Sequence, residues 1–230
     1  MTSSQLSCVL LTTDQDALAT PAEAFARTVL DLRHVSRYPR SARQLDPEAI
    51  AALGRGAVDL LVSFLCPVVV APAALQAARL AAINFHPAPP EWPGVGAASL
   101  ALYHGDTSFG VTAHLMAEHV DSGAILRVAR FLIRPEDRCE TVWARALEQT
   151  LSLFCDVMRD IAATGRITLS AERWARAAMS RRAFERWMTI SPTDPIDDID
   201  RKVRACRHSQ FPGPFVEIAG WRFELPPASE

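Results

Sequence analysis

Residues 58–65 read VDLLVSFL, a nearly continuous apolar run that is typical of a strand buried on both faces of a sheet. A helix signal precedes this run, because Asp46 is followed by a proline in the first turn and Gly54 or Gly56 ends the helix. A second helical segment, residues 72–78, follows it. Helices on both sides of a buried strand predict parallel strands that are joined by crossover helices.

Two more apolar runs extend this pattern outward. Residues 7–11 predict the first strand, and residues 82–86, AINFH, predict the third. The alternation predicts an α/β fold, a doubly wound and mostly parallel sheet with helices on both faces. In such sheets the ligand crevice lies outside the carboxyl ends of the strands. Asn84 and His86 close the third strand, and they are therefore candidate site residues.

The segments that follow complete a first domain. Four prolines within seven residues exclude a regular helix or a central strand immediately after His86. A loop that carries Asp121 joins two further extended segments. In chain order we expect a proline-rich loop, a helix, two strands and a long amphipathic helix over residues 87–94, 96–103, 110–116, 124–128 and 140–161.

The character of the sequence changes near residue 165, which predicts a first domain of residues 1–165 and a C-terminal extension of residues 166–230. In the extension, Asp194 is expected to cap a helix with one apolar face, and Ala219 and Gly220 are expected to turn a terminal β-hairpin. The apolar face of the helix consists of Ile196, Ile199, Val203 and Cys206. The hairpin offers a free strand edge and an apolar face, which predict a homodimer; that face consists of Phe215, Val216, Ile218, Trp221 and Phe223.

Composition limits the classes of partner. The 230 residues include 24 basic and 26 acidic side chains, so no overall field attracts a nucleic acid or an anionic membrane. No apolar run reaches membrane-spanning length, and the first twenty residues lack the pattern of a secretory signal. Five cysteines without a paired motif suit neither a disulfide framework nor a zinc site. We therefore expect a cytoplasmic protein with no nucleic-acid or membrane partner.

Three residues form the candidate reacting centre. Asn84 offers amide donors, His86 a switchable imidazole and Asp121 a carboxylate, and the predicted topology can bring them to one crevice. Each residue also has a structural alternative, because asparagine and an Asp-Ser-Gly sequence are common in turns and a single histidine is often structural. Spacing alone leaves both interpretations open.

The same residues carry a resemblance to a known family. NFHP at residues 84–87, Gly94, Gly105 with Asp106, GVTAH at residues 110–114 and DSGAIL at residues 121–126 resemble the signature of formyltetrahydrofolate-dependent formyltransferases. The resemblance covers residues 58–165. It implies a Rossmann-like catalytic domain with Asn84, His86 and Asp121 as its triad. It also implies 10-formyltetrahydrofolate as the formyl donor and no metal.

The implied chemistry suits these residue types. An amine attacks the formyl carbon, Asn84 and His86 stabilise the oxyanion, and Asp121 orients His86 and helps to relay the proton. The resemblance further implies that the pterin lies between residues 64–68 and residues 116–121. The cofactor-binding residues implied in this way are Phe64, Leu65, Pro67, Val68, Met116, Ala117, Glu118 and Val120.

The loop after the histidine bears on the substrate. Residues 88–94 read APPEWPG, where purine-pathway and methionyl-tRNA formyltransferases typically have Ser-Leu-Leu-Pro. This loop is similar to that of sugar N-formyltransferases, and the extension leaves little room for the larger C-terminal barrel of methionyl-tRNA formyltransferases. The resemblance therefore implies a nucleotide-linked amino sugar as substrate, in surface polysaccharide or O-antigen biosynthesis. Trp92 is expected either to stack on this substrate or to pack within its loop.

Several alternatives stay open. A formyltetrahydrofolate hydrolase, a glycinamide ribonucleotide transformylase, an N-formyltransferase of a natural-product pathway and a non-catalytic folate- or nucleotide-binding module all fit parts of the pattern. His86, His114 and His119 suggest a metal site only weakly, because no Glu or Cys ligand has matching spacing. The arginines between residues 173 and 186 either bind a diphosphate or form a solvated helix face.

Overall fold

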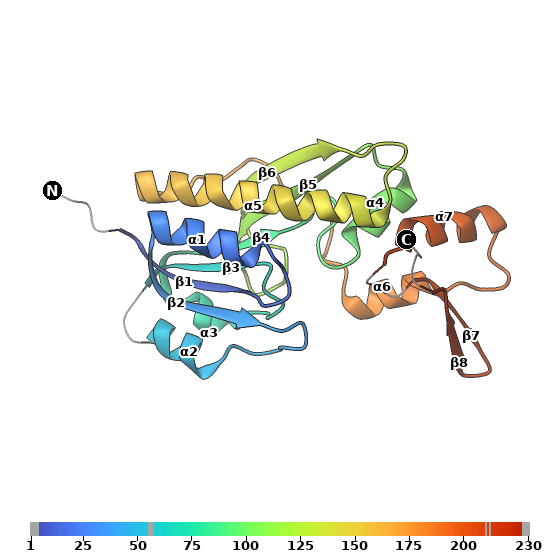
Figure 1. Cartoon of the computed structure of the whole chain (residues 1–230), viewed down its shortest axis with the longest axis horizontal. Coiled ribbons are helices and arrows are strands. Elements are labelled where there is room, and N and C mark those ends of the chain that lie inside the picture. The colour runs from blue at the N-terminus through green and yellow to red at the C-terminus, as the bar shows by residue number, and fades with distance from the viewer. Residues whose placement is uncertain (1–4, 55–57, 210, 212, 227–230) are drawn as a thin grey trace.

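The computed structural model describes residues 5–54, 58–209, 211 and 213–226, and its centre is a six-stranded sheet in the order β2-β1-β3-β4-β5-β6 (Figure 1). The strands are β1 (Ser7–Thr13), β2 (Asp31–Tyr38), β3 (Val58–Phe64), β4 (Ala78–His86), β5 (Ser108–Leu115) and β6 (Ile125–Leu132). Neighbouring strands from β2 to β4 are parallel, whereas β5 and β6 are antiparallel. The predicted mostly parallel α/β sheet is confirmed.

Helices cover both faces of this sheet, as predicted. In Figure 1, α1 (Ala19–Val29) and α5 (Cys139–Thr164) lie above the sheet, and α2 (Pro47–Gly54) and α3 (Pro72–Leu75) lie below it. Side chains alternate along β1, so that Leu10 joins the core beneath α1 and α5 while Leu11 joins the core against α2. Burial on both faces explains why the inner strands are continuous apolar runs.

In the part of the chain before residue 165, strand β2 and helix α1 were not predicted. β2 is an edge strand with a half-exposed surface and the charged sequence DLRHVSRY, so it lacks an apolar run. α1 buries only the small side chains Ala19, Ala22 and Ala26, which give a weak helical pattern. The helix predicted over residues 72–78 is also shorter, because β4 begins at Ala78.

A chain segment that we call the strap, residues 166–180, follows α5 and runs back along the sheet. Gly165 ends α5 with a φ of 64°, a left-handed conformation that glycine adopts without strain. The strap then forms backbone hydrogen bonds from Ser170 N to Ile125 O (2.8 Å) and from Ala175 N to Pro90 O (3.0 Å). The division predicted near residue 165 thus falls at a helix end, and the first part of the extension packs on the preceding residues.

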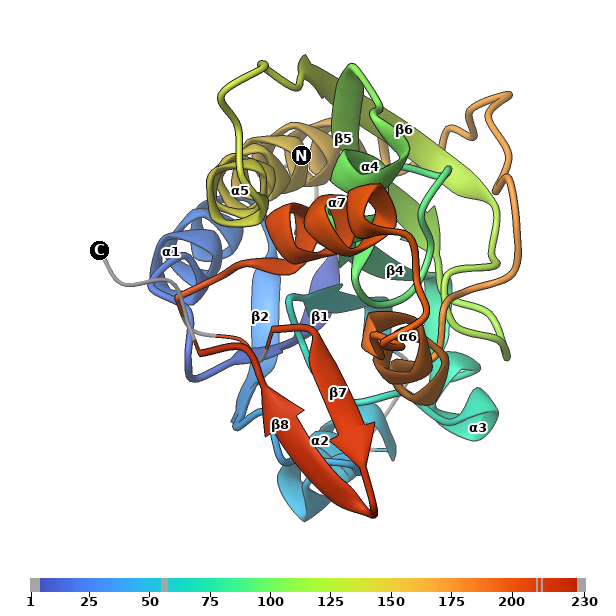
Figure 2. The ribbon, with the colours of Figure 1, turned by 90° about the vertical axis from the view of Figure 1, so that its right-hand side faces the viewer.

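The remaining extension comprises α6 (Arg181–Met188), α7 (Ile196–Cys206) and the hairpin of β7 (Phe215–Ile218) and β8 (Trp221–Glu224) (Figure 2). α7 packs against α4 (Ala97–His104). The predicted capping of α7 by Asp194 is wrong, because this carboxylate accepts a hydrogen bond from Ser191 N at 2.9 Å. The predicted apolar face is also only partly right, since Ile196 is 68% exposed and Lys202 is buried.

The antiparallel hairpin is confirmed, but its apolar face is smaller than predicted. Phe215 is buried against Met188 and Cys206 and does not belong to an exposed face. Trp221 and Phe223 are 74% and 58% exposed. Within the described ranges, no helix combines the length and the apolar character that crossing a bilayer requires.

Candidate active site

Strands β4 and β5 place the candidate residues on one face of the sheet. Ile83 and Phe85 point into the core beneath α1 and α5, so Asn84 and His86, which alternate with them, point to the opposite face. His114 on β5 is paired with Asn84 across the antiparallel ladder. Directly opposed side chains in such a ladder lie within contact distance of each other.

Asp121 joins this group from the loop between β5 and β6. Its Oδ2 atom lies 3.4 Å from His86 Nδ1, and its Oδ1 atom lies 3.3 Å from His114 Nε2. The backbone N–H of Gly94 donates to Oδ2 at 2.8 Å. Asn84 contacts the cluster through His114, with 3.1 Å between Asn84 Nδ2 and His114 Nε2. The structure therefore brings the three predicted residues together, with His114 as the link between two of them.

The loop that carries Asp121 has an unusual backbone conformation. Asp121 has a φ of 46°, in the left-handed region that few residues other than glycine adopt. Two residues later, a Cβ atom at Gly123 would lie 1.9 Å from the carbonyl oxygen of Leu115, so only glycine fits. Strained backbone of this kind is frequent at functional sites, where surrounding contacts hold it in place.

Burial and neighbouring groups determine the charge states of His86 and Asp121. Burial lowers the pKa of His86, and the nearby His114 lowers it further, while the Asp121 carboxylate partly offsets both effects. Burial alone would raise the pKa of Asp121, but His86, His114 and the Gly94 N–H outweigh it and bring the pKa to about 2. At neutral pH the site thus contains an uncharged His86 beside an ionised Asp121. The carboxylate favours the tautomer with hydrogen on Nδ1, and the other ring nitrogen, Nε2, lies 3.5 Å from the carbonyl oxygen of Trp92.

Comparison with known proteins identifies the family. A family model described as formyl transferase matches residues 2–158 of the 230-residue chain. The chain belongs to the formyl transferase family.

Curated relatives of this formyl transferase are methionyl-tRNA formyltransferases. The protein of Synechococcus sp. (strain JA-3-3Ab) is 40% identical over 92 residues, which are 40% of this chain and 29% of that protein. The protein of Burkholderia multivorans is 25% identical over 190 residues, which are 82% of this chain and 56% of that protein. The chain thus spans less than two thirds of the length of these relatives.

Solved structures with the same fold include sugar N-formyltransferases. The sugar N-formyltransferase from Shewanella sp. FDAARGOS_354 has a TM-score of 0.75 at 17% identity and covers 98% of both chains. The 4-N formyltransferase from Francisella tularensis has a TM-score of 0.73 at 14% identity over 97% of this chain and 98% of that one. The N-formyltransferase from Helicobacter canadensis, solved with folinic acid and dTDP-3-aminofucose, has a TM-score of 0.65 at 12% identity over 94% and 85%. These likenesses confirm the Rossmann-like fold.

His114 is a site residue for which the sequence predicted no catalytic role, although it stands in the motif at residues 110–114 and was weighed as a metal ligand. In this formyl transferase it is 2% exposed, and its Nδ1 donates to the carbonyl oxygen of Leu115 at 2.8 Å. Its Nε2 lies between Asn84 and Asp121. The available signal was its position in a strand next to the one that carries Asn84. Within the described part of the chain, no group of three or more His, Cys, Asp or Glu side chains could hold a metal ion.

Trp92 packs within its loop, which was one of its two expected roles. Trp92 is only 6% exposed, and its indole N–H donates to the Asp106 carboxylate at 2.6 Å. The ring stacks on His104 with 5.1 Å between centroids, and the Arg176 guanidinium lies 4.1 Å from its centroid. Protein groups thus pack against the ring, and a substrate-binding role for Trp92 stays a prediction.

The two segments expected to hold the pterin lie close together. Val68, Ala82 and Met116 belong to the same apolar cluster, and Met116 N donates to Ala82 O at 2.7 Å. The Phe64 ring packs in the opposite core against Phe85 and Phe154, so only its backbone can face a ligand on this side. Of the residues expected to bind the cofactor, those that are half-buried or exposed are Leu65, Pro67, Met116, Ala117, Glu118 and Val120. Their positions allow contact with a flat ligand, and their roles stay predictions.

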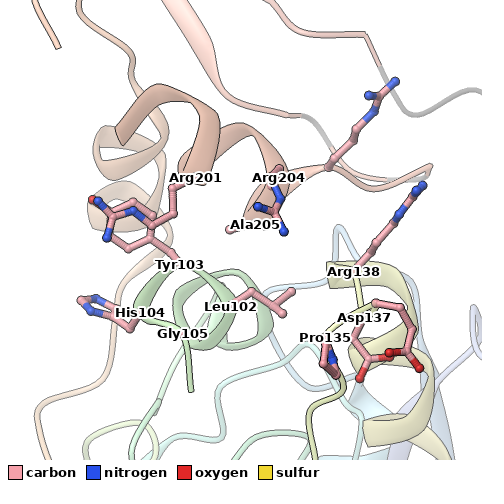
Figure 3. Close-up of a pocket in the computed structure, with 12 residues that line it drawn as sticks. Leu102, Tyr103, His104, Gly105, Pro135, Asp137, Arg138, Arg201, Arg204 and Ala205 are labelled. Carbon is pink, nitrogen blue, oxygen red and sulfur yellow. The ribbon is translucent and has the colours of Figure 1, made fainter. Parts of the chain in front are cut away.

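The arginines of the strap make local contacts. Arg173 donates to three carbonyl oxygens just before it in the chain, and Arg176 lies over Trp92. A cavity of about 690 Å³ at the C-terminal end of α4 is lined by other arginines. Figure 3 shows Arg201 and Arg204 on one side of it and Arg138 on the other. This cavity shares no lining residue with the cluster of Asn84, His86, His114 and Asp121.

Proposed function

We propose that this formyl transferase moves the formyl group of 10-formyltetrahydrofolate to the primary amine of a nucleotide-linked amino sugar. The observation that carries the proposal is the buried cluster in which Asp121 contacts both His86 and His114, with Asn84 beside them. The Helicobacter canadensis N-formyltransferase was solved with folinic acid and dTDP-3-aminofucose, which supports a folate donor and a nucleotide-sugar acceptor for this fold.

The cluster can perform each proton transfer of the reaction. As the amine nitrogen bonds to the formyl carbon, an N–H of the Asn84 amide can donate to the developing oxyanion, because the amide carries two N–H groups. Uncharged His86 accepts the proton of the attacking amine, and Asp121 stabilises the imidazolium. His86 then gives this proton to N10 as the bond between the carbon and N10 breaks. Both products leave uncharged at the reacting atoms.

The formyl donor is proposed to bind between residues 64–68 and residues 116–121. Leu65, with a φ of 55°, lies directly after β3 in a left-handed conformation, and the backbone groups of this turn are proposed to contact the pterin ring. Val68 and Met116 supply an apolar wall on this side of the sheet. Phe64 contributes through its backbone only.

The acceptor distinguishes two candidate functions. A sugar nucleotide is favoured by the sugar N-formyltransferase from Shewanella, since the two chains cover 98% of each other and the likeness therefore extends through the C-terminal extension. Initiator methionyl-tRNA is the second candidate, because the curated relatives carry that name. The formal net charge of −2 argues against a large phosphate backbone as acceptor. We further propose a cytoplasmic homodimer formed through the exposed face of the hairpin.

The test is the release of tetrahydrofolate in the presence of different amines. The panel contains nucleotide-linked 3-amino and 4-amino sugars, glycinamide ribonucleotide and initiator methionyl-tRNA. We expect turnover with one amino sugar and a loss of about 100-fold in kcat for His86→Ala. His34→Ala is the matched control, because His34 lies on the edge strand β2, where its ring bonds to Ser36. Turnover with methionyl-tRNA alone would establish the second candidate, and no turnover with any amine would overturn both.

A further inference from the structure

Trp174 in the strap lies against both histidines of the reacting centre. Its ring meets the His114 ring edge-on, with 5.0 Å between centroids and 89° between planes. The corresponding values to His86 are 6.1 Å and 62°. The indole N–H of Trp174 donates to the carbonyl oxygen of Gly123 at 2.7 Å. One side chain from the C-terminal extension therefore contacts two site histidines and the loop that carries Asp121.

The strap is attached on both sides of Trp174. Before it, Ser170 N donates to Ile125 O at 2.8 Å; after it, Met179 N donates to Pro93 O at 2.9 Å and Val95 N donates to Met179 O at 3.0 Å. These bonds fix the chain on either side of the indole. They also place the strap beside the segment that holds Asp121 through Gly94 N.

The fit between strap and site is close. A Cβ atom at Gly94 would lie 2.2 Å from the carbonyl oxygen of Met179, so the two backbones are in contact. Gly123, which accepts the indole N–H, is itself pressed against Leu115 O. The strap thus contacts the Asp121 loop and its Gly94 partner, and small shifts of the strap must be transmitted to both.

We propose that Trp174 is a positioning residue of formyl transfer, which holds the Asp121 loop through Gly123 and excludes water from the His86 and His114 rings. The effect of Trp174 on the rate of formyl transfer rests on the function proposed above. A hydrogen-bonded aromatic ring is suited to both tasks, because its N–H fixes an orientation while its apolar body covers the neighbouring rings. Trp174 itself takes no part in bond formation.

Exclusion of water has a consequence for His86. The charged and titratable groups that face its ring are Asp121 from the loop and His114 from β5. Burial, the largest of the effects on His86, lowers its pKa. Loss of the indole would admit water while both neighbours remain. The pKa of His86 should then rise toward its ordinary value.

The experiment compares Trp174→Phe and Trp174→Ala with Trp187→Phe and Trp187→Ala. Trp187 is a matched control because it also belongs to the extension but packs against Tyr103 and Phe184, away from the triad. For Trp174→Phe, which keeps a ring and loses the N–H, we expect about a five- to ten-fold lower kcat. For Trp174→Ala we expect about a 100-fold lower kcat with little change in KM, and an acid limb of the kcat/KM profile at higher pH.

A second measurement does not depend on turnover. NMR titration of ¹⁵N-labelled histidine follows His86 and His114 in the wild-type chain, the Trp174 variants and the Trp187 variants. We expect a higher pKa for His86 only in Trp174→Ala. Unchanged histidine titrations together with wild-type kinetics in both Trp174 variants would overturn the proposal. Inactivity of the wild-type chain with every amine would reject the proposed function, and the titrations would still decide the role of Trp174.

Discussion

His86 Nδ1 and Asp121 Oδ2 lie 3.4 Å apart in a site from which bulk water is largely excluded. This pair connects a residue at the end of β4 with a residue in the loop after β5. An uncharged imidazole next to a carboxylate can take up a proton and keep it close to the acceptor nitrogen.

The pH dependence of kcat/KM should reflect His86. Because its pKa lies below the ordinary value of 6.5 and the uncharged form is the active one, activity should persist below pH 6.5 and fall only as His86 becomes protonated. Asp121→Asn removes the charge that raises this pKa, so the acid limb should move to still lower pH while kcat falls. A limb above pH 6.5 in the wild-type chain would contradict this assignment.

His114→Phe should impair catalysis without unfolding the protein. Phenylalanine fills the buried volume but cannot contact Asn84 or Asp121, so we expect about a 10- to 100-fold lower kcat. Steady-state kinetics with saturating donor measure this change, and circular dichroism checks the fold. His34→Phe on the edge strand is the control, and equal kcat values for the two variants would exclude a role for His114.

Gly94→Ala should destabilise the protein. Gly94 has a φ of 87°, and an added Cβ would lie 2.2 Å from Met179 O. We expect a loss of about 2 kcal/mol or more in the free energy of unfolding, measured by urea denaturation. Gly54→Ala is the matched control, since a Cβ there meets nothing within 4 Å and alanine favours a helix. Equal stability of both variants would show that the strap does not constrain Gly94.

The hairpin provides the test of the proposed homodimer. Trp221 is 74% exposed and Phe223 is 58% exposed on β8. If these side chains form the interface, the double variant Trp221→Ser and Phe223→Ser should change the mass from two chains to one at micromolar concentration, measured by light scattering. A wild-type mass of one chain would contradict the homodimer. Ile50→Ser, a change at a 57% exposed residue of α2, is the control for general surface polarity.

Sequence patterns predicted the elements that bury continuous apolar runs. The strand at residues 58–65 and the long helix that ends near Gly165 were recognised because burial on one or both faces repeats along the chain. β2 was missed because an edge strand buries few apolar side chains. α1 was missed because its buried residues are alanines, which give a weak apolar pattern. The local pattern also predicted that Ile196 belongs to the buried face of α7, which is wrong. The buried face of α7 depends on α4, a helix that is distant in sequence.

The candidate site was predicted in part, because short local motifs contain some of its residues. Asn84, His86 and Asp121 stand in recognisable local motifs, and the structure gathers them. Trp174 is distant from Asp121 in the sequence and lies in a segment without regular structure. No periodicity connects the two, because their proximity arises from the length of α5 and the return path of the strap.

The return of the strap onto the sheet limits how this chain can be recombined with its relatives. An exchange of C-terminal segments at residue 165 would cut at a helix end, yet it would supply the site with a foreign strap. A junction after Ser180, at the start of α6, would leave the indole with its own histidines. Chimaeras joined after residue 180 should therefore retain the native catalytic geometry.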